Sequence, residues 1–141
     1  MTTLWIALGG ALGSVARFWL AALAEPISRS LPLGTIAINV SGSLLIGLFG
    51  TLTLHNGRFP ASESVRLFVM VGFCGGFTTF SSFSLQTLEL LRAGAWTRAL
   101  VNMAASLLLC LAAVAAGHAL AAQINGGARH YAEIETEEET F

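Results

Sequence analysis

The residues whose types could do chemistry gather in one uncharged segment. Residues 72–84 read GFCGGFTTFSSFS, in which Phe77, Phe80 and Phe83 repeat every three residues with hydroxyl side chains between them. We expect Phe77 to pack in the core. The edge of a phenyl ring is electropositive, so the other two rings and their neighbouring hydroxyls can give an anion several weak contacts. Conduction requires such contacts, because an ion must both enter a pore and leave it.

The same segment contains two consecutive glycines, Gly75 and Gly76. We expect them to break a helix there and to free backbone carbonyl and amide groups. Unpaired backbone at membrane depth is tolerated only where it is buried in protein or lines a cavity. Discontinuous helices of this kind mark binding sites in transport proteins.

Polar side chains elsewhere form two stripes at four-residue spacing. The stripes are Thr35, Asn39 and Ser43, and then Asn102, Ser106 and Cys110. Residues four apart share one face of a helix. One interpretation is hydrogen bonding between helices, at about 0.6 kcal/mol per pair. Two stripes that contain no carboxylate and no lysine favour the other interpretation, the lining of a narrow path for a hydrogen-bond acceptor.

These segments belong to a chain that is too apolar to be soluble. Of the 141 residues, 55% are hydrophobic and 11% are charged, whereas a soluble domain has roughly 25% charged residues. The net charge of −1 argues against nucleic acid, which requires a basic surface. The composition therefore predicts a multi-pass protein of a cell membrane, and we expect no enzymatic activity.

The gaps between charges predict an all-α fold with four membrane-spanning helices, since about 20 apolar residues cross a bilayer. The predicted spans are 4–23, 33–54, 67–88 and 99–122, within one domain of residues 1–124. Residues 125–141 hold five of the eight Glu and are predicted to form a disordered acidic tail. Small residues four apart, which allow close helix contact, occur in three spans. They are Gly9 and Gly13, Ser43 and Gly47, and Ala112 and Ala116.

Charge counting does not choose an orientation in the membrane. One side would hold Arg58, Arg66 and Arg129, and the other would hold Arg29, Arg92 and Arg98. Equal numbers leave the positive-inside rule without a preference. A weak preference set by other signals is one explanation. We favour dual topology, in which copies insert both ways and pair antiparallel.

Arg17 is the one charged residue inside a predicted span. Charges in lipid are costly, so its guanidinium must reach protein, water or headgroups. Arg17 either extends to the membrane interface along its own alkyl chain or lines a positively charged vestibule that gathers anions.

The glycine- and hydroxyl-rich segment, GGFTTFSSFS at 75–84, resembles the Fluc (CrcB-like) fluoride channels. Gly34, Thr35 and Asn39 at the start of the second span also resemble that family, as does the pattern of Gly9, Gly10, Gly13 and Arg17. The resemblance extends over about residues 4–122. It implies passive export of fluoride across the inner membrane of a prokaryote by an antiparallel homodimer with two ion pathways.

The resemblance also implies roles for individual residues. The rings of Phe80 and Phe83 would contact fluoride by their edges, Asn39 would donate a hydrogen bond, and Arg17 would lie in the vestibule. The residues expected along the pathway are Asn39, Thr79, Phe80, Ser82, Phe83 and Ser106. Chloride would be too wide to pass between Phe80 and Phe83.

A structural sodium ion at the dimer centre is a further implication of the resemblance. Its ligands would be the backbone carbonyls of Gly75 and Thr78 from both subunits. Oxygen ligands suit a hard cation, and an interrupted helix can offer them.

Three positions differ from residues that are common in the family. This chain has Gln86 where Glu is frequent, Asn102 where Tyr is frequent, and Cys110 where Ser is frequent. A thiol donates hydrogen bonds only weakly, so conduction along this part of the path is expected to differ.

Two other functions remain open at this point. A small multidrug transporter driven by protons also has four helices, but its proton relay needs a carboxylate inside the membrane. No predicted span has Asp or Glu in its interior. The second alternative is an assembly factor, whose polar stripes would only join helices and which would carry no ion.

Overall fold

The computed structural model describes residues 2–126, which form helices and short connections and contain no β-strand. The elements are α1 (Thr2–Ala24), η1 (Glu25–Ile27), α2 (Leu33–Leu52), α3 (Glu63–Arg66), η2 (Leu67–Cys74), α4 (Gly75–Phe77), α5 (Phe80–Arg92) and α6 (Trp96–Ile124). The predicted acidic tail lies outside the described residues, except for Asn125 and Gly126.

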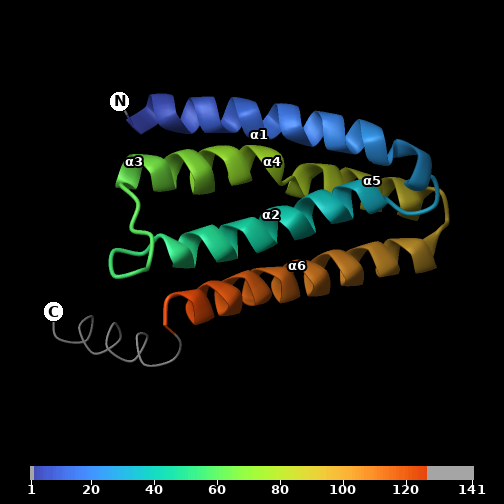
Figure 1. Ribbon diagram of the computed structural model, residues 1–141. Helices are drawn as coiled ribbons and strands as arrows, with labels where there is room; N and C mark the ends of the chain where they lie inside the picture. The colour runs from blue at the N-terminus through green and yellow to red at the C-terminus, as the bar shows by residue number, and fades with distance from the viewer. Residues whose placement is uncertain (1, 127–141) are drawn as a thin grey trace, which may run out of the picture.

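Four stretches are long and apolar enough to cross a membrane. They are Thr2–Ile27, Leu33–Leu52, Glu63–Arg92 and Trp96–Ile124. The prediction of an all-helical protein with four spans is confirmed, and the chain is a multi-pass membrane protein. Figure 1 shows the stretches side by side, with the N-terminus and the end of α6 at the same end of the bundle.

Glycines set the distance between α1 and the third stretch. A Cβ atom on Gly9 would collide with the Phe68 carbonyl oxygen, and one on Gly13 would collide with the Phe73 carbonyl oxygen. From the opposite side, a Cβ atom on Gly76 would lie 2.5 Å from the Gly10 carbonyl oxygen. The two backbones therefore touch directly, as the spacing of Gly9 and Gly13 predicts.

Glycines also allow close contact between the backbones of α2 and α6. A Cβ atom on Gly47 would collide with the Val114 carbonyl oxygen, and one on Gly117 with the Leu44 carbonyl oxygen. Ala112 and Ala116, by contrast, are exposed in the single chain. Gly117 was not among the residues predicted to make close contacts.

The third stretch is helical through the two glycines and is interrupted after them. Gly75 has the helical angles φ −64° and ψ −37°, whereas Thr78 (φ −76°, ψ 157°) and Thr79 (φ −152°, ψ 109°) are extended. The predicted position of the break is therefore corrected to Thr78 and Thr79. The reason is that Gly76 serves the contact with α1, which requires a regular helix without a side chain at that position.

Candidate functional site

Asn39 on α2 holds the two extended residues that separate α4 from α5. Its Oδ1 accepts a hydrogen bond from the Thr79 N–H at 2.8 Å, and its Nδ2 donates to the Thr79 carbonyl at 3.2 Å. One side chain thus satisfies both backbone groups of Thr79, a residue that is 7% exposed. The carboxamide of Asn39 has two N–H groups, and the second one takes part in neither of these two bonds.

Thr79 also begins the next helix. Its Oγ1 accepts a hydrogen bond from the Ser82 N–H at 3.1 Å, which caps the N-terminus of α5. The same hydroxyl donates to Ser82 Oγ at 2.9 Å. The hydroxyls of Thr79 and Ser82, both predicted for the pathway, are therefore bonded to each other at the helix start.

The interruption leaves two carbonyls without their helical donors. In a continuous helix, Gly75 would accept from the Thr79 N–H and Thr78 from the Ser82 N–H. Both amides donate to side-chain oxygens instead. Gly75 and Thr78 are the residues whose carbonyls the family resemblance assigns to a sodium ion, and carbonyl oxygens are suitable ligands for a hard cation. Two carbonyl oxygens freed in this way are chemically suited to such an ion.

A cavity of about 670 Å³ opens beside the interruption. Its walls come from α2, η2, α4, the interruption, α5 and α6. It brings together five of the six predicted pathway residues, Asn39, Thr79, Phe80, Phe83 and Ser106. Ser82 does not line it. No charged side chain is among the lining residues, and the rest of the wall is mainly apolar.

The two predicted rings form the wall of this cavity on α5. The ring centroids of Phe80 and Phe83 lie 5.3 Å apart, and the ring planes are inclined by 48°. Phe80 is 78% exposed in the single chain, whereas Phe83 is half-buried. Phe77 is 7% exposed and stacks on Phe73, which confirms its predicted place in the core.

The wall on α6 contains a hydroxyl without a partner. Ser106 is 8% exposed and lines the cavity, and its Oγ has no hydrogen bond to any of residues 2–126. Asn102, one turn earlier, is fully buried; its Nδ2 donates to Thr87 Oγ1 at 2.8 Å and its Oδ1 has no partner. Thr87, which was not predicted, in turn donates to the Phe83 carbonyl at 2.7 Å. Cys110 lines the same wall.

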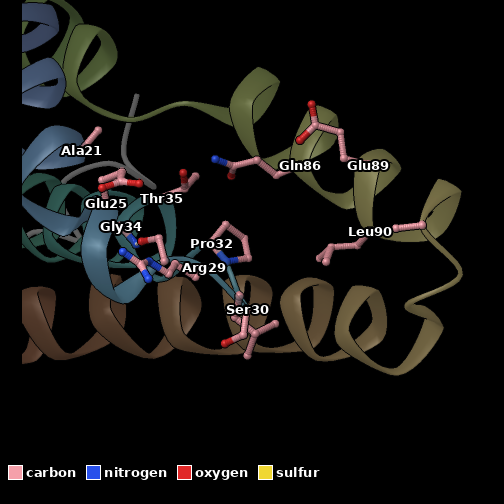
Figure 2. A pocket seen from close by; sticks show the side chains of 13 residues that line it. Ala21, Glu25, Arg29, Ser30, Pro32, Gly34, Thr35, Gln86, Glu89 and Leu90 are labelled. Carbon is pink, nitrogen blue, oxygen red and sulfur yellow. The ribbon is translucent and has the colours of Figure 1, made fainter.

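A second cavity, of about 410 Å³, lies at the end of the bundle where α1 ends and α2 begins (Figure 2). Thr35 and Gln86 line it, each one turn from a residue of the first cavity, Asn39 on α2 and Phe83 on α5. Arg17 is half-buried and lines neither of these two cavities, but it lies one turn before Ala21, which lines the second.

Comparison with known proteins identifies the family. The family model described as "CrcB-like protein, Camphor Resistance (CrcB)" matches residues 4–118. The chain belongs to the CrcB-like family. A protein of Methylobacterium radiotolerans named fluoride-specific ion channel FluC is 62% identical over 138 residues, which are 98% of this chain and 96% of that protein. A protein of Gluconobacter oxydans with the same name is 58% identical over 139 residues, which are 98% of this chain and 96% of that protein.

A further family member, from Methylocella silvestris, has the same name and is 58% identical over 126 residues, which are 89% of this chain and 96% of that protein. These names support the interpretation as a channel. They give no support to the interpretation as a multidrug antiporter. All three relatives are bacterial, in agreement with the predicted membrane of a prokaryote.

Proposed function

We propose that this protein is a fluoride-specific channel through which fluoride leaves the cytoplasm passively. The observation that supports this function best is the shared cavity beside Thr78 and Thr79. It combines two phenyl rings, a carboxamide and a buried, partnerless hydroxyl, and no charged side chain lines it. The names of the bacterial family members point to the same ion.

The chemistry of the wall suits a small anion. Fluoride leaving water must exchange its hydration shell for other donors. Ser106 Oγ can donate its O–H, and Asn39 has one amide N–H beyond the bond to Thr79. The electropositive edges of Phe80 and Phe83 add weak attraction. Each contact is weak, so the ion is replaced easily by the next one.

Selectivity against chloride follows from width. Chloride is larger than fluoride, and the rings of Phe80 and Phe83, in contact with centroids 5.3 Å apart, would leave the wider ion less room beside them. It also holds water less tightly, so it gains less from the donors of Asn39 and Ser106. The wall therefore favours the ion that is both smaller and the better hydrogen-bond acceptor.

We propose an antiparallel homodimer as the working unit. In one subunit the cavity is open on the side of Gly75 and Phe80, both exposed. Such a surface, with a freed carbonyl, faces lipid poorly because lipid offers no hydrogen bonds. A second copy would cover it, and the equal arginine counts at the two membrane sides permit opposite orientations.

A sodium ion at the centre of this dimer is part of the proposal. The Gly75 and Thr78 carbonyls of two subunits would supply four oxygen ligands. Bound sodium would stabilise the dimer by joining the two interrupted helices. We expect replacement of sodium by N-methylglucamine to lower the thermal stability of the purified dimer, with unchanged stability as the contradicting result.

Reconstitution tests the function directly. Liposomes loaded with potassium fluoride and given a potassium ionophore should release fluoride to an electrode when they contain the purified protein. Liposomes loaded with potassium chloride should release no chloride above the protein-free background. A protein that forms dimers but releases no fluoride would be an assembly factor, and release only against a proton gradient would indicate an exchanger.

A further inference from the structure

The second cavity contains three charged side chains of both signs. Glu25 from η1, Arg29 from the connection to α2 and Glu89 from α5 line it together with uncharged residues. All three charged residues are exposed. Figure 2 shows Glu25 and Arg29 on one side of the cavity and Glu89 on the other.

These three charged side chains are not joined as ion pairs within residues 2–126. The lining therefore has one positive and two negative charges at neutral pH. Arg17 and Arg92 belong to helices that border the cavity, but neither lines it.

The cavity lies directly before the proposed ion pathway. Thr35 and Gln86 line it, and the next turns of the same helices bring Asn39 and Phe83 into the first cavity. An ion that reaches Asn39 and Phe83 from this end of the bundle passes the three charged side chains first. Their field acts on the local concentration of the anion, since like charges lower it and opposite charges raise it.

We infer that this cavity is an entry chamber in which Arg29, opposed by Glu25 and Glu89, sets the local concentration of fluoride at the start of the pathway. The inference rests on the proposed channel function and adds three residues to it. The chamber changes the local concentration of fluoride and leaves the passage between the rings unchanged. Its charges should therefore alter the fluoride concentration at half-maximal flux and leave the maximal flux as it is.

Neutralising each charge should give effects of opposite sign. In Arg29→Gln, loss of the positive charge should reduce initial fluoride efflux about threefold at low fluoride and low ionic strength, as expected for one charge several ångströms from the ion in water. In Glu89→Gln the same efflux should rise about threefold, and in Glu25→Gln it should rise as well. A gain of efflux cannot come from misfolding, so it keeps the test valid if Arg29→Gln folds poorly.

Arg98→Gln is the matched control. Arg98 is exposed, lies near the start of α6 at the same end of the bundle (Figure 1), and lines neither cavity. It should leave efflux unchanged. Raising inert salt to about 1 M reduces the screening length to about 3 Å, and the differences between the three chamber variants and the unmodified protein should then disappear.

Three outcomes distinguish the ideas. No efflux from the unmodified protein would overturn the proposed channel function itself. Efflux from the unmodified protein, with Arg29→Gln and Glu89→Gln no different from Arg98→Gln, would overturn only the entry chamber. Changes that persist in high salt, or that alter the maximal flux, would also overturn it, because they would show a structural and not an electrostatic effect.

Discussion

At the scale of residues, the proposed site is built from side chains that line the cavity and also bind the backbone. Asn39 binds both backbone groups of Thr79, and the Thr79 hydroxyl caps α5. Ser106 differs, because its buried hydroxyl has no partner in the part of the chain that the structure describes. The free donor is thus the residue best prepared to meet an anion, and the bonded residues keep the rings in position.

The two rings give the most direct test of the pathway. Phe80→Ile and Phe83→Ile each remove an electropositive ring edge and keep an apolar side chain of moderate size, so we expect fluoride efflux from liposomes to be abolished while the dimer still assembles. Phe59→Ile, an exposed ring in the connection before α3, is the control and should conduct normally. Unchanged efflux in both pathway variants would remove the rings from the mechanism.

Asn39→Ala should affect stability as well as flux. It leaves the N–H and the carbonyl of buried Thr79 without partners, at about 1–3 kcal/mol for each group, and frees the segment that positions Phe80. We expect lower thermal stability in detergent and reduced efflux. Ser41→Ala on the same helix is the control, because the Ser41 hydroxyl bonds only to carbonyls of its own helix. Equal stability of the two variants would contradict this role of Asn39.

At the scale of elements, backbone contacts through glycine determine where the interrupted stretch lies. The helix α1 touches η2 and α4 at Gly9, Gly13 and Gly76. The eight-residue π-helix η2 precedes the interruption, so the position of α4 depends on how η2 packs against α1. The interruption itself is therefore held from both sides, by α1 through glycines and by α2 through Asn39.

Gly13→Ala should disrupt this packing, and Gly10→Ala should not. A Cβ atom at residue 13 would collide with the Phe73 carbonyl, whereas at residue 10 its nearest neighbour is the Gly72 carbonyl oxygen at an ordinary 3.9 Å. Overpacking typically costs 1–3 kcal/mol. The folded yield and melting temperature of the Gly13 variant should fall in size-exclusion and thermal assays. Similar behaviour of both variants would show that the contact is not tight.

At the scale of the whole molecule, charge and shape both support the proposed antiparallel dimer. The connections and ends on the two membrane sides have equal numbers of arginines, with Arg129 outside the described residues. The cavity beside the interruption is open in one subunit and exposes Phe80. A partner in the opposite orientation would close it and duplicate the pathway.

Dual topology can be tested by adding charge. A reporter fused to the C-terminus should be found on both sides of the membrane in the unmodified protein. Three arginines added to the connection between α2 and α3 should fix one orientation, since short basic connections stay in the cytoplasm. We expect that variant to form no active dimer when it is expressed alone. Efflux should return when it is expressed together with a second variant, in which the arginines are added to the connection between α5 and α6 instead. Activity of the fixed variant alone would contradict an antiparallel dimer.

The sequence by itself determined the membrane class and the four helices, and it predicted several residues that line the cavity beside the interruption. A low charge content and four long apolar stretches, of which only the first holds a charge, predict helices, because about 20 apolar residues match a helical span whereas a barrel strand needs only about 9–11. The spacing of Gly9 and Gly13 predicted a close contact that the structure contains. Hydroxyls, rings and amides predicted for one path also share one cavity, apart from Ser82.

The tertiary structure alone decided where the third stretch is interrupted. Two glycines weaken a helix locally, but at Gly76 the missing side chain is used for contact with Gly10, and the helix continues. The interruption lies where Asn39 of another helix offers hydrogen bonds to Thr79. Only packing brings residues 39 and 79 together. Local propensity therefore predicted an interruption, and a distant hydrogen-bond partner determined its position.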